Sequence, residues 1–357
     1  MKVMRYMSIV LAGAMLFLAG CGGSAPSSKP EPSKDQPASS APAAAPAAPK
    51  ETMKVKLAFA GSKTGMLWLP SAFAYYNNYF KDEAIEIEIV EMKGGAEAAQ
   101  ALVSGDVDFA SMALEHAIKA KAQGVDLTML SLYTRYPGFA LVVDSKLKDK
   151  VKSVKDLKGM KVGITSPGSS THKALLSVMS AAGMQPSDIE AIPVGTSVIP
   201  AIEAGKVQAT MHADPWITQL ITSGKAYSIA DLRAKQDTES LFGGDYPNGG
   251  LVTRSELLTK NSEMVSRMVR AIVKANKFLA GNSAETIASK LPAEFKGTDE
   301  ALFLASLRAN LEMFAPDSKA TEKGLQAVID SLKKDKVIPE TADIKPASVF
   351  DSSFIGK

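Results

Sequence analysis

Apolar and polar residues follow two different periods along most of the chain after residue 53. Residues 54–60 and 85–90 alternate between apolar and polar side chains, which is typical of β-strands. Residues 66–80 and 262–279 carry apolar side chains three and four positions apart, which is typical of amphipathic helices. Because strand and helix patterns succeed one another, we predict an α/β fold with a largely parallel sheet covered by helices on both faces.

The predicted elements fall into two blocks and a helical remainder. In the first block, residues 53–138, further elements are expected at 96–104 (helix), 107–110 (strand), 113–123 (helix) and 127–133 (strand). In the second block, residues 139–244, strands are expected at 139–143, 161–164, 189–194, 208–211 and 227–230, and helices at 169–183, 198–204 and from Pro215. A short strand at 251–253 precedes helices at 262–279, 300–313 and 322–332. We expect residues 245–357 to pack on the first block, so that two interleaved lobes surround one cleft.

The first 20 residues have the pattern of a bacterial secretory signal. Lys2 and Arg5 precede an apolar run over residues 9–19, and small residues follow the run. The run is too short to span a bilayer, which needs about 20 apolar residues. The sequence Leu-Ala-Gly-Cys that ends at Cys21 resembles the lipobox of bacterial lipoproteins. We therefore predict a signal peptide over 1–20 and lipidation of Cys21, with an ordinary signal peptide and a chance cysteine as the alternative.

Residues 21–52 are predicted to be a lipid-anchored tether. Between residues 22 and 50, 21 of the 29 residues are Pro, Ala or Ser. Such a segment cannot bury an apolar core, so we expect it to be disordered and partly extended. A lipid, a tether and a globular part together predict a protein that works outside the cytoplasm and stays near its membrane.

Composition narrows the function classes further. The 357 residues are 46% hydrophobic and 22% charged, with a net charge of +3. Removal of residues 1–20 takes two basic residues away and leaves 39 basic against 38 acidic ones. A nucleic-acid-binding protein concentrates basic charge, so we expect no nucleic-acid partner. The chain has one cysteine, which excludes an intramolecular disulfide framework and any metal site built from several thiolates.

Three stretches resemble one group of proteins. They are Ala-Leu-Val-Ser-Gly-Asp-Val-Asp-Phe-Ala at 101–110, Asp-Leu-Lys-Gly-Met-Lys-Val-Gly-Ile at 156–164, and Ala-Gly-Lys-Val-Gln-Ala at 204–209 followed by Asp-Pro. Together they are similar to solute-binding proteins of ABC importers in the nitrate/sulfonate/taurine group, which also includes thiamine-pyrimidine binders. The resemblance implies a type II periplasmic-binding-protein fold, with two α/β lobes, two crossing segments that form a hinge, and a central ligand cleft. Gln208 departs from the group, which usually has Asp at that position.

Ligands of open α/β sheets bind at the carboxyl ends of strands, where helix N-termini present free N–H groups. In the first lobe this rule selects Ser62, Thr64 and Gly65 after the first strand, with a polar turn as the alternative. Ser111 follows a predicted strand and is a candidate ligand donor, a helix N-cap, or both. Trp68 is a candidate to stack on a planar ligand, and burial in the core is the alternative.

In the second lobe the same rule selects Ser169, Ser170 and Thr171, which follow a strand and open a helix. Three hydroxyls at a helix N-terminus form the best cradle for an anionic oxygen in the chain, and simple helix capping is the alternative. His212 and Asp214 follow the next strand. A structural hydrogen bond for His212 and an N-cap role for Asp214 are the alternatives to ligand contact.

Tyr133 and Arg135 lie where the chain is expected to leave the first lobe. The guanidinium of Arg135 matches carboxylates and sulfonates, and a salt bridge between the lobes is the equally weighted alternative. Tyr133 is a further candidate for contact with a planar ring.

The sequence offers little for catalysis. His116, His172 and His212 lack the spacing of a metal motif, and the chain has no Gly-x-Ser-x-Gly nucleophile elbow. We therefore expect no catalytic residue, no metal and no cofactor, and we predict a protein that is not an enzyme.

The predicted function is capture of a small organic anion or heterocycle by hinge closure, followed by delivery to a membrane permease. The expected partners are the solute, an ABC permease and the membrane through the lipid anchor, and the protein is expected to be monomeric. A lipoprotein that presents its ligand to a receptor is one alternative. A pyrimidine- or menaquinone-pathway enzyme on the same fold is another.

Overall fold

The computed structural model describes residues 51–357. The predicted signal peptide, the predicted lipidation site at Cys21 and nearly all of the predicted tether lie outside the described residues. Within the described part of the chain, no helix is both long enough and apolar enough to cross a membrane.

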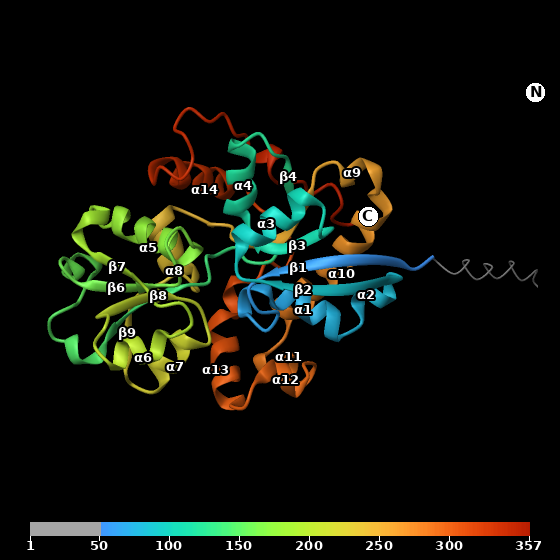
Figure 1. Cartoon of the computed structure of the whole chain (residues 1–357). Coiled ribbons are helices and arrows are strands. Elements are labelled where there is room, and N and C mark those ends of the chain that lie inside the picture. The colour runs from blue at the N-terminus through green and yellow to red at the C-terminus, as the bar shows by residue number, and fades with distance from the viewer. Residues whose placement is uncertain (1–50) are drawn as a thin grey trace, which may run out of the picture. The chain divides into compact units, whose positions relative to one another are not determined.

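Two five-stranded sheets form the framework, with the strand orders β2-β1-β3-β10-β4 and β7-β6-β8-β5-β9 (Figure 1). The strands of the first sheet are β1 (Met53–Ala60), β2 (Ile85–Met92), β3 (Phe109–Ala113), β4 (Leu127–Leu132) and β10 (Gly249–Arg254). The strands of the second sheet are β5 (Ala140–Asp144), β6 (Lys161–Ile164), β7 (Glu190–Pro193), β8 (Ala209–His212) and β9 (Ala226–Asp231).

Both sheets are mixed, which corrects the prediction of a largely parallel sheet. β1 runs parallel to β2 and β3, whereas β10 runs antiparallel to β3 and β4. In the second sheet β5 runs antiparallel to β8 and β9. β5 and β10 are the first strands after the chain has passed from one sheet to the other. Each enters its sheet at the end where the neighbouring strands finish, so it must run back against them.

Each sheet contributes to a hydrophobic core on both of its faces, as the alternating pattern predicts. Leu57 and Phe59 of β1 belong to one core cluster, and Ala58 between them belongs to another. Leu141 and Ala140 of β5 are divided between two clusters in the same way. Successive side chains of a strand point to opposite faces, so helices must cover both faces of each sheet.

The helices around the first sheet come from both ends of the described chain. The first group is α1 (Leu69–Tyr76), α2 (Tyr79–Asp82), α3 (Gly95–Ser104) and α4 (Leu114–Ala122). The second group is α9 (Leu257–Lys260), α10 (Ser262–Gly281), α11 (Ala284–Ser289), α12 (Ala293–Lys296), α13 (Glu300–Asn310) and α14 (Glu322–Lys334). α10 packs on α1 and α2, and α14 packs on α4. We call the first sheet with these helices the first lobe.

The helices around the second sheet are α5 (Ser170–Ala181), α6 (Val198–Glu203), α7 (Trp216–Thr222) and α8 (Lys235–Phe242). We call this sheet with its helices the second lobe. α8 is absent from the sequence prediction, because its sequence Lys-Gln-Asp-Thr-Glu-Ser-Leu-Phe is apolar only at its end and shows no helical period. Short 3-10 turns complete the chain at η1 (Met66–Trp68), η2 (Ser145–Leu147), η3 (Val154–Leu157), η4 (Pro186–Asp188), η5 (Leu311–Met313) and η6 (Pro346–Ser348).

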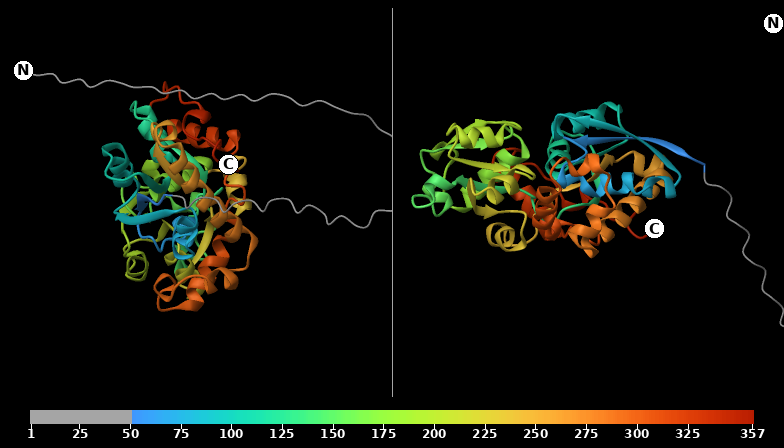
Figure 2. Two further views of the ribbon diagram at one scale, coloured as in Figure 1. Left: turned by 90° about the vertical axis from the view of Figure 1, so that its right-hand side faces the viewer. Right: turned by 90° about the horizontal axis from the view of Figure 1, so that it is seen from below.

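Two crossing segments join the lobes (Figures 1 and 2). The first contains Thr134, Arg135 and Pro137, the second contains Tyr246 and Asn248, and the two are hydrogen-bonded to each other. The N–H of Tyr246 donates to the carbonyl of Arg135 at 2.9 Å, and that of Asn248 donates to the carbonyl of Thr134 at 3.1 Å. The side-chain amide of Asn248 also donates to the carbonyl of Pro137 at 2.6 Å. The lobe boundaries that we predict at 138/139 and 244/245 fall in or beside these segments and stay predictions.

Candidate functional site

A chain of hydroxyls lies at the carboxyl end of β6, where the second lobe turns into α5. Ser169 caps α5 and accepts the N–H of His172 at 3.3 Å. Its hydroxyl is 2.9 Å from that of Thr171, which lies 3.1 Å from the hydroxyl of Thr165. The N–H of Thr165 donates to Thr171 at 3.0 Å. Gly168, with a φ of +74°, allows the turn that folds these residues onto one another.

His212 at the end of β8 continues this network. Its Nε2 lies 3.2 Å from the Thr165 hydroxyl and 3.1 Å from the carbonyl of Gly195. Its Nδ1 accepts the N–H of Ala213 at 3.0 Å, so we assign the proton to Nε2. Burial lowers the pKa of His212, against smaller opposite effects of these backbone groups. The ring is therefore neutral at pH 7, and it meets the ring of Trp216 edge to face at 4.8 Å.

The first lobe meets the start of α5 through the start of α4, in a second group of contacts. Ser170 donates to Glu115 Oε1 at 2.6 Å, and Lys173 Nζ lies 3.1 Å from the same oxygen. His116 Nε2 lies 3.5 Å from the same oxygen. Burial acts to raise the pKa of Glu115, but the attraction to charged Lys173, with smaller contributions from His116 and the hydrogen bond of Ser170, outweighs it and lowers the pKa.

Two groups of contacts meet at the start of α5, one through the hydroxyls of Ser169 and Thr171 and one through Ser170 and Lys173. We take their residues together as the candidate site and name it the α5 cluster. Its members are Thr165, Ser169, Ser170, Thr171, Lys173 and His212 of the second lobe with Glu115 and His116 of the first. Sequence reasoning selected Ser169, Ser170, Thr171 and His212 and missed the rest. No local pattern links Glu115 to Lys173, because they lie far apart in the chain and belong to different lobes.

The predicted residues of the first turn stay apart from the α5 cluster. The Ser62 hydroxyl lies 3.0 Å from the Thr64 hydroxyl and donates to Glu91 at 3.0 Å. Gly65 follows in the same turn. The Trp68 indole donates to the carbonyl of Ala60 at 3.1 Å and is 7% exposed, as the core alternative predicts.

Ser111 and Tyr133 lie inside the first lobe. Both are fully buried and bond with Ser71, at 2.7 Å from Ser111 and 2.5 Å from Tyr133. The N-cap role considered for Ser111 is wrong. β3 extends to Ala113, which occupies the N-cap position of α4, because pairing with β10 keeps residues 109–113 in the sheet.

Arg135 and Asp214 each take part in an ion pair. Arg135 lies 2.7 Å from Asp317 and 3.9 Å from Asp245. Both partners fall within residues 245–357, which we predict to belong to the first lobe, so this ion pair is not the salt bridge between the lobes that the sequence left open. Pro215 occupies the N-cap position of α7, so the N-cap role considered for Asp214 is wrong by one residue. Asp214 nevertheless accepts the N–H of Thr218 in the first turn at 2.8 Å, and it accepts the guanidinium of Arg233 at 2.9 Å. The helix itself begins at Trp216, one residue later than predicted.

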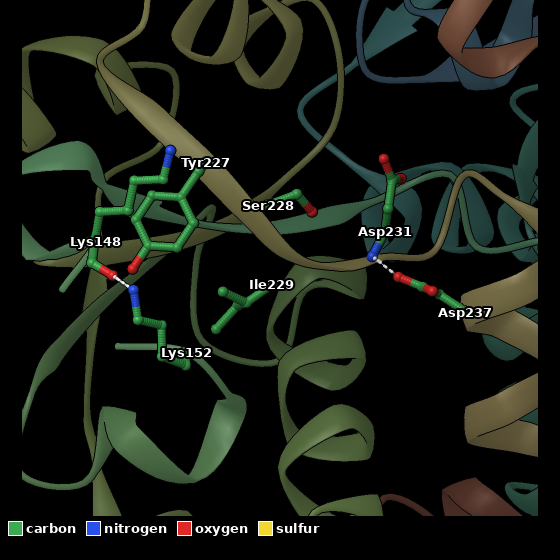
Figure 3. A pocket seen from close by; sticks show the side chains of 7 residues that line it. All are labelled: Lys148, Lys152, Tyr227, Ser228, Ile229, Asp231 and Asp237. Carbon is green, nitrogen blue, oxygen red and sulfur yellow. Dashed lines mark hydrogen bonds between the residues drawn. The ribbon is translucent and has the colours of Figure 1, made fainter. Parts of the chain in front are cut away.

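An open pocket of about 460 Å³ lies elsewhere on the second lobe, beside β9 (Figure 3). It is lined by Lys148, Lys152, Tyr227, Ser228, Ile229, Asp231 and Asp237. The Tyr227 hydroxyl donates to the carbonyl of Val151, and the N–H of Asp231 donates to Asp237. The pocket contains none of the predicted ligand residues. Among residues 51–357 no group of three or more His, Cys, Asp or Glu side chains is arranged to hold a metal ion.

Comparison with known sequences adds two findings. The profile of the family described as NMT1/THI5 like matches residues 69–286. The 4-amino-5-hydroxymethyl-2-methylpyrimidine phosphate synthase THI13 of Saccharomyces cerevisiae is 26% identical over 216 residues, which are 59% of this chain and 63% of that protein. The chain thus spans just under two thirds of the length of this curated relative.

Comparison with solved structures covers both lobes. A protein from Bordetella bronchiseptica RB50 is 30% identical, with a TM-score of 0.76 over 85% of this chain and 95% of that one. The periplasmic aliphatic sulphonate binding protein SsuA from Escherichia coli is 19% identical, with a TM-score of 0.65 over 83% of this chain and 96% of that one. These likenesses confirm the predicted type II periplasmic-binding-protein fold.

Proposed function

The chain belongs to the NMT1/THI5-like family, and from that premise we propose that it is the extracytoplasmic solute-binding component of an ABC importer. The observation that carries the proposal is the α5 cluster. Its hydroxyls lie at strand ends of the second lobe and meet the first lobe through the contact of Ser170 with Glu115. Strand ends and helix N-termini of this kind are where open α/β folds bind ligands.

We infer that the ligand is a small organic anion or a planar heterocycle. Ser169 and Thr171 offer hydroxyls beside the N-terminus of α5, whose free N–H groups favour negative charge. Neutral His212 and the adjacent Trp216 ring offer aromatic surface of the kind that a planar ring contacts. Closure of the lobes would complete the contacts, so that binding shifts the equilibrium from open to closed.

The remaining parts of the proposal concern location and partners. Lipidation of Cys21 would hold the protein at the membrane, and the tether would let it reach a permease. We propose that it acts as a monomer on a small-molecule solute.

A synthase is the second candidate, because the yeast relative bears the name of a synthase. Recovery of the bound compound after incubation distinguishes the two functions. An importer component returns the compound unchanged, whereas an enzyme converts it.

A thermal-shift screen tests the proposal. The panel contains alkanesulfonates, nitrate, carboxylates and pyrimidines. A ligand at 100 times its Kd stabilises the folded protein by about 2.7 kcal/mol, so a specific ligand raises the melting temperature. A panel in which no compound raises it counts against solute binding.

A pair of serine variants then tests the location of the site. Ser169 and Ser283 each cap a helix by accepting an N–H at 3.3 Å, so Ser169→Ala and Ser283→Ala are matched in the cost of losing a cap. We expect Ser169→Ala to lower the affinity for the ligand found in the screen. Ser283→Ala is expected to leave that affinity unchanged. Equal affinity in both variants would refute the placement at α5.

A further inference from the structure

One face of α5 carries the polar contacts between that helix and the first lobe. Ser170, Lys173 and Ser177 are three and four residues apart, so they lie on the same side of the helix. Ser170 and Lys173 contact Glu115 on α4, and Ser177 lies 3.0 Å from Ser331 on α14. Ser177 also donates to Asp335, the residue that follows α14, at 3.2 Å. We call these three residues the α5 stripe.

The ion pair between Glu115 and Lys173 lies towards the N-terminal end of the stripe, and it is buried where the two lobes touch. The side chain of Glu115 is 11% exposed and that of Lys173 is 10% exposed. α4 packs on strands of the first sheet, and α5 packs on β8 of the second. Separation of the lobes would therefore move the carboxylate and the ammonium apart and return both to water.

The C-terminal end of the stripe, at Ser177, lies close to Tyr246 of the second crossing segment. The pKa of Tyr246 is raised by burial, and its hydroxyl is influenced by hydrogen bonds with Ser331 and Ser177. Tyr246 belongs to the second crossing segment, where it bonds with Arg135 of the first. Seven residues of helix separate Ser177 from Ser170, which is about 10 Å.

We propose that Glu115 and Lys173 form a clasp between the lobes that sets how much of the protein is closed before a ligand binds. Both groups belong to the chain, so the clasp forms without any ligand. A buried charge is tolerated only while its partner is present, so loss of one partner favours the open arrangement in which the other is hydrated. The conformational part of the proposal rests on the fold alone, whereas its effect on ligand affinity rests on the proposed function.

The test measures the distance between the lobes in the full chain without added solute. Cys21→Ser removes the native thiol, and Gln100→Cys on α3 and Lys206→Cys on the second lobe carry spin labels at exposed positions. We expect Lys173→Met and Glu115→Gln each to lengthen the mean distance and to lower the ratio of closed to open protein on the order of tenfold. Lys158→Met is the control for the same substitution at an exposed ion pair within one lobe, since Lys158 pairs with Asp188 at 3.1 Å.

The double variant Glu115→Gln/Lys173→Met separates a clasp from a general packing defect. With both charges gone no buried charge is left unpaired, so we expect its distance distribution to lie nearer the wild type than that of either single variant. Unchanged distances in folded single variants would overturn the proposal, and so would a double variant more open than both singles. If the distance between the lobes changes in the single variants but no compound raises the melting temperature in the thermal-shift screen, the clasp is supported and solute binding is rejected.

Discussion

His212 illustrates, at the scale of single residues, how burial decides what a side chain does in this protein. The histidine lies among backbone groups and hydroxyls that hold one tautomer, and burial keeps it neutral. Burial also lowers the pKa of His116 and His172. All three histidines of the chain therefore bind a proton less readily in the folded state than in the unfolded state.

This difference predicts how stability depends on pH. The unfolded chain takes up protons as the pH falls below the ordinary histidine value of 6.5, while the folded chain resists until each lowered pKa is reached. The free energy of unfolding is therefore expected to fall as the pH drops from 7.5 to 5.5. Urea denaturation at both pH values measures the change. In His212→Asn the loss of unfolding free energy between pH 7.5 and pH 5.5 is expected to be smaller than in the wild type. A loss equal to that of the wild type would contradict the role of His212.

At the scale of elements, neighbours decide where helices and strands end. The helix predicted over 66–80 is divided into η1, α1 and α2, with Asn78 in the left-handed region at a φ of 60° between the last two. Most other predicted elements are present within a few residues of their expected bounds. The local pattern locates an element, whereas pairing with β10 or packing against another helix fixes its last residues.

The contact between α3 and α4 gives a prediction at this scale. A β-carbon built on Gly95, the first residue of α3, would lie 2.1 Å from His116 Nε2. Gly95→Ala must displace the buried histidine, so we expect it to destabilise the protein by about 1–3 kcal/mol. The matched control is Gly94→Ala, where a β-carbon meets nothing within 4 Å. Denaturant unfolding of both variants measures the difference, and equal losses would contradict the predicted clash.

At the scale of the whole molecule, the lobes also meet at a second joint, between α13 and α7. Asn310 of α13 donates to Asp214, which also accepts the guanidinium of Arg233. The side chain of Asp214 is fully buried and that of Arg233 is 5% exposed. Loss of either partner would leave the buried carboxylate of Asp214 incompletely compensated and would destabilise the folded protein.

Arg233→Met is expected to leave Asp214 without its counter-charge and to cost about 3–5 kcal/mol of stability. Lys158→Met removes a pair in which the lysine is 76% exposed, so its cost is expected to stay below about 1 kcal/mol. Thermal unfolding of both variants provides the comparison. If Arg233→Met loses no more stability than Lys158→Met, the buried ion pair of Asp214 with Arg233 does not stabilise the contact between α13 and α7.

The sequence by itself determined the α/β class, the order of most strands and helices and the family resemblance, because these depend on residues close together in the chain. It also located the hydroxyls at the start of α5 and the likeness of the N-terminus to a lipoprotein signal. Only the tertiary structure decided which candidates come together. Ser169, Thr171 and His212 join one hydrogen-bond network and Ser170 beside them contacts Glu115, whereas Ser111 and Tyr133 are internal to the first lobe. Glu115 and Lys173 meet across two lobes, and no local pattern encodes a contact between residues so distant in the chain.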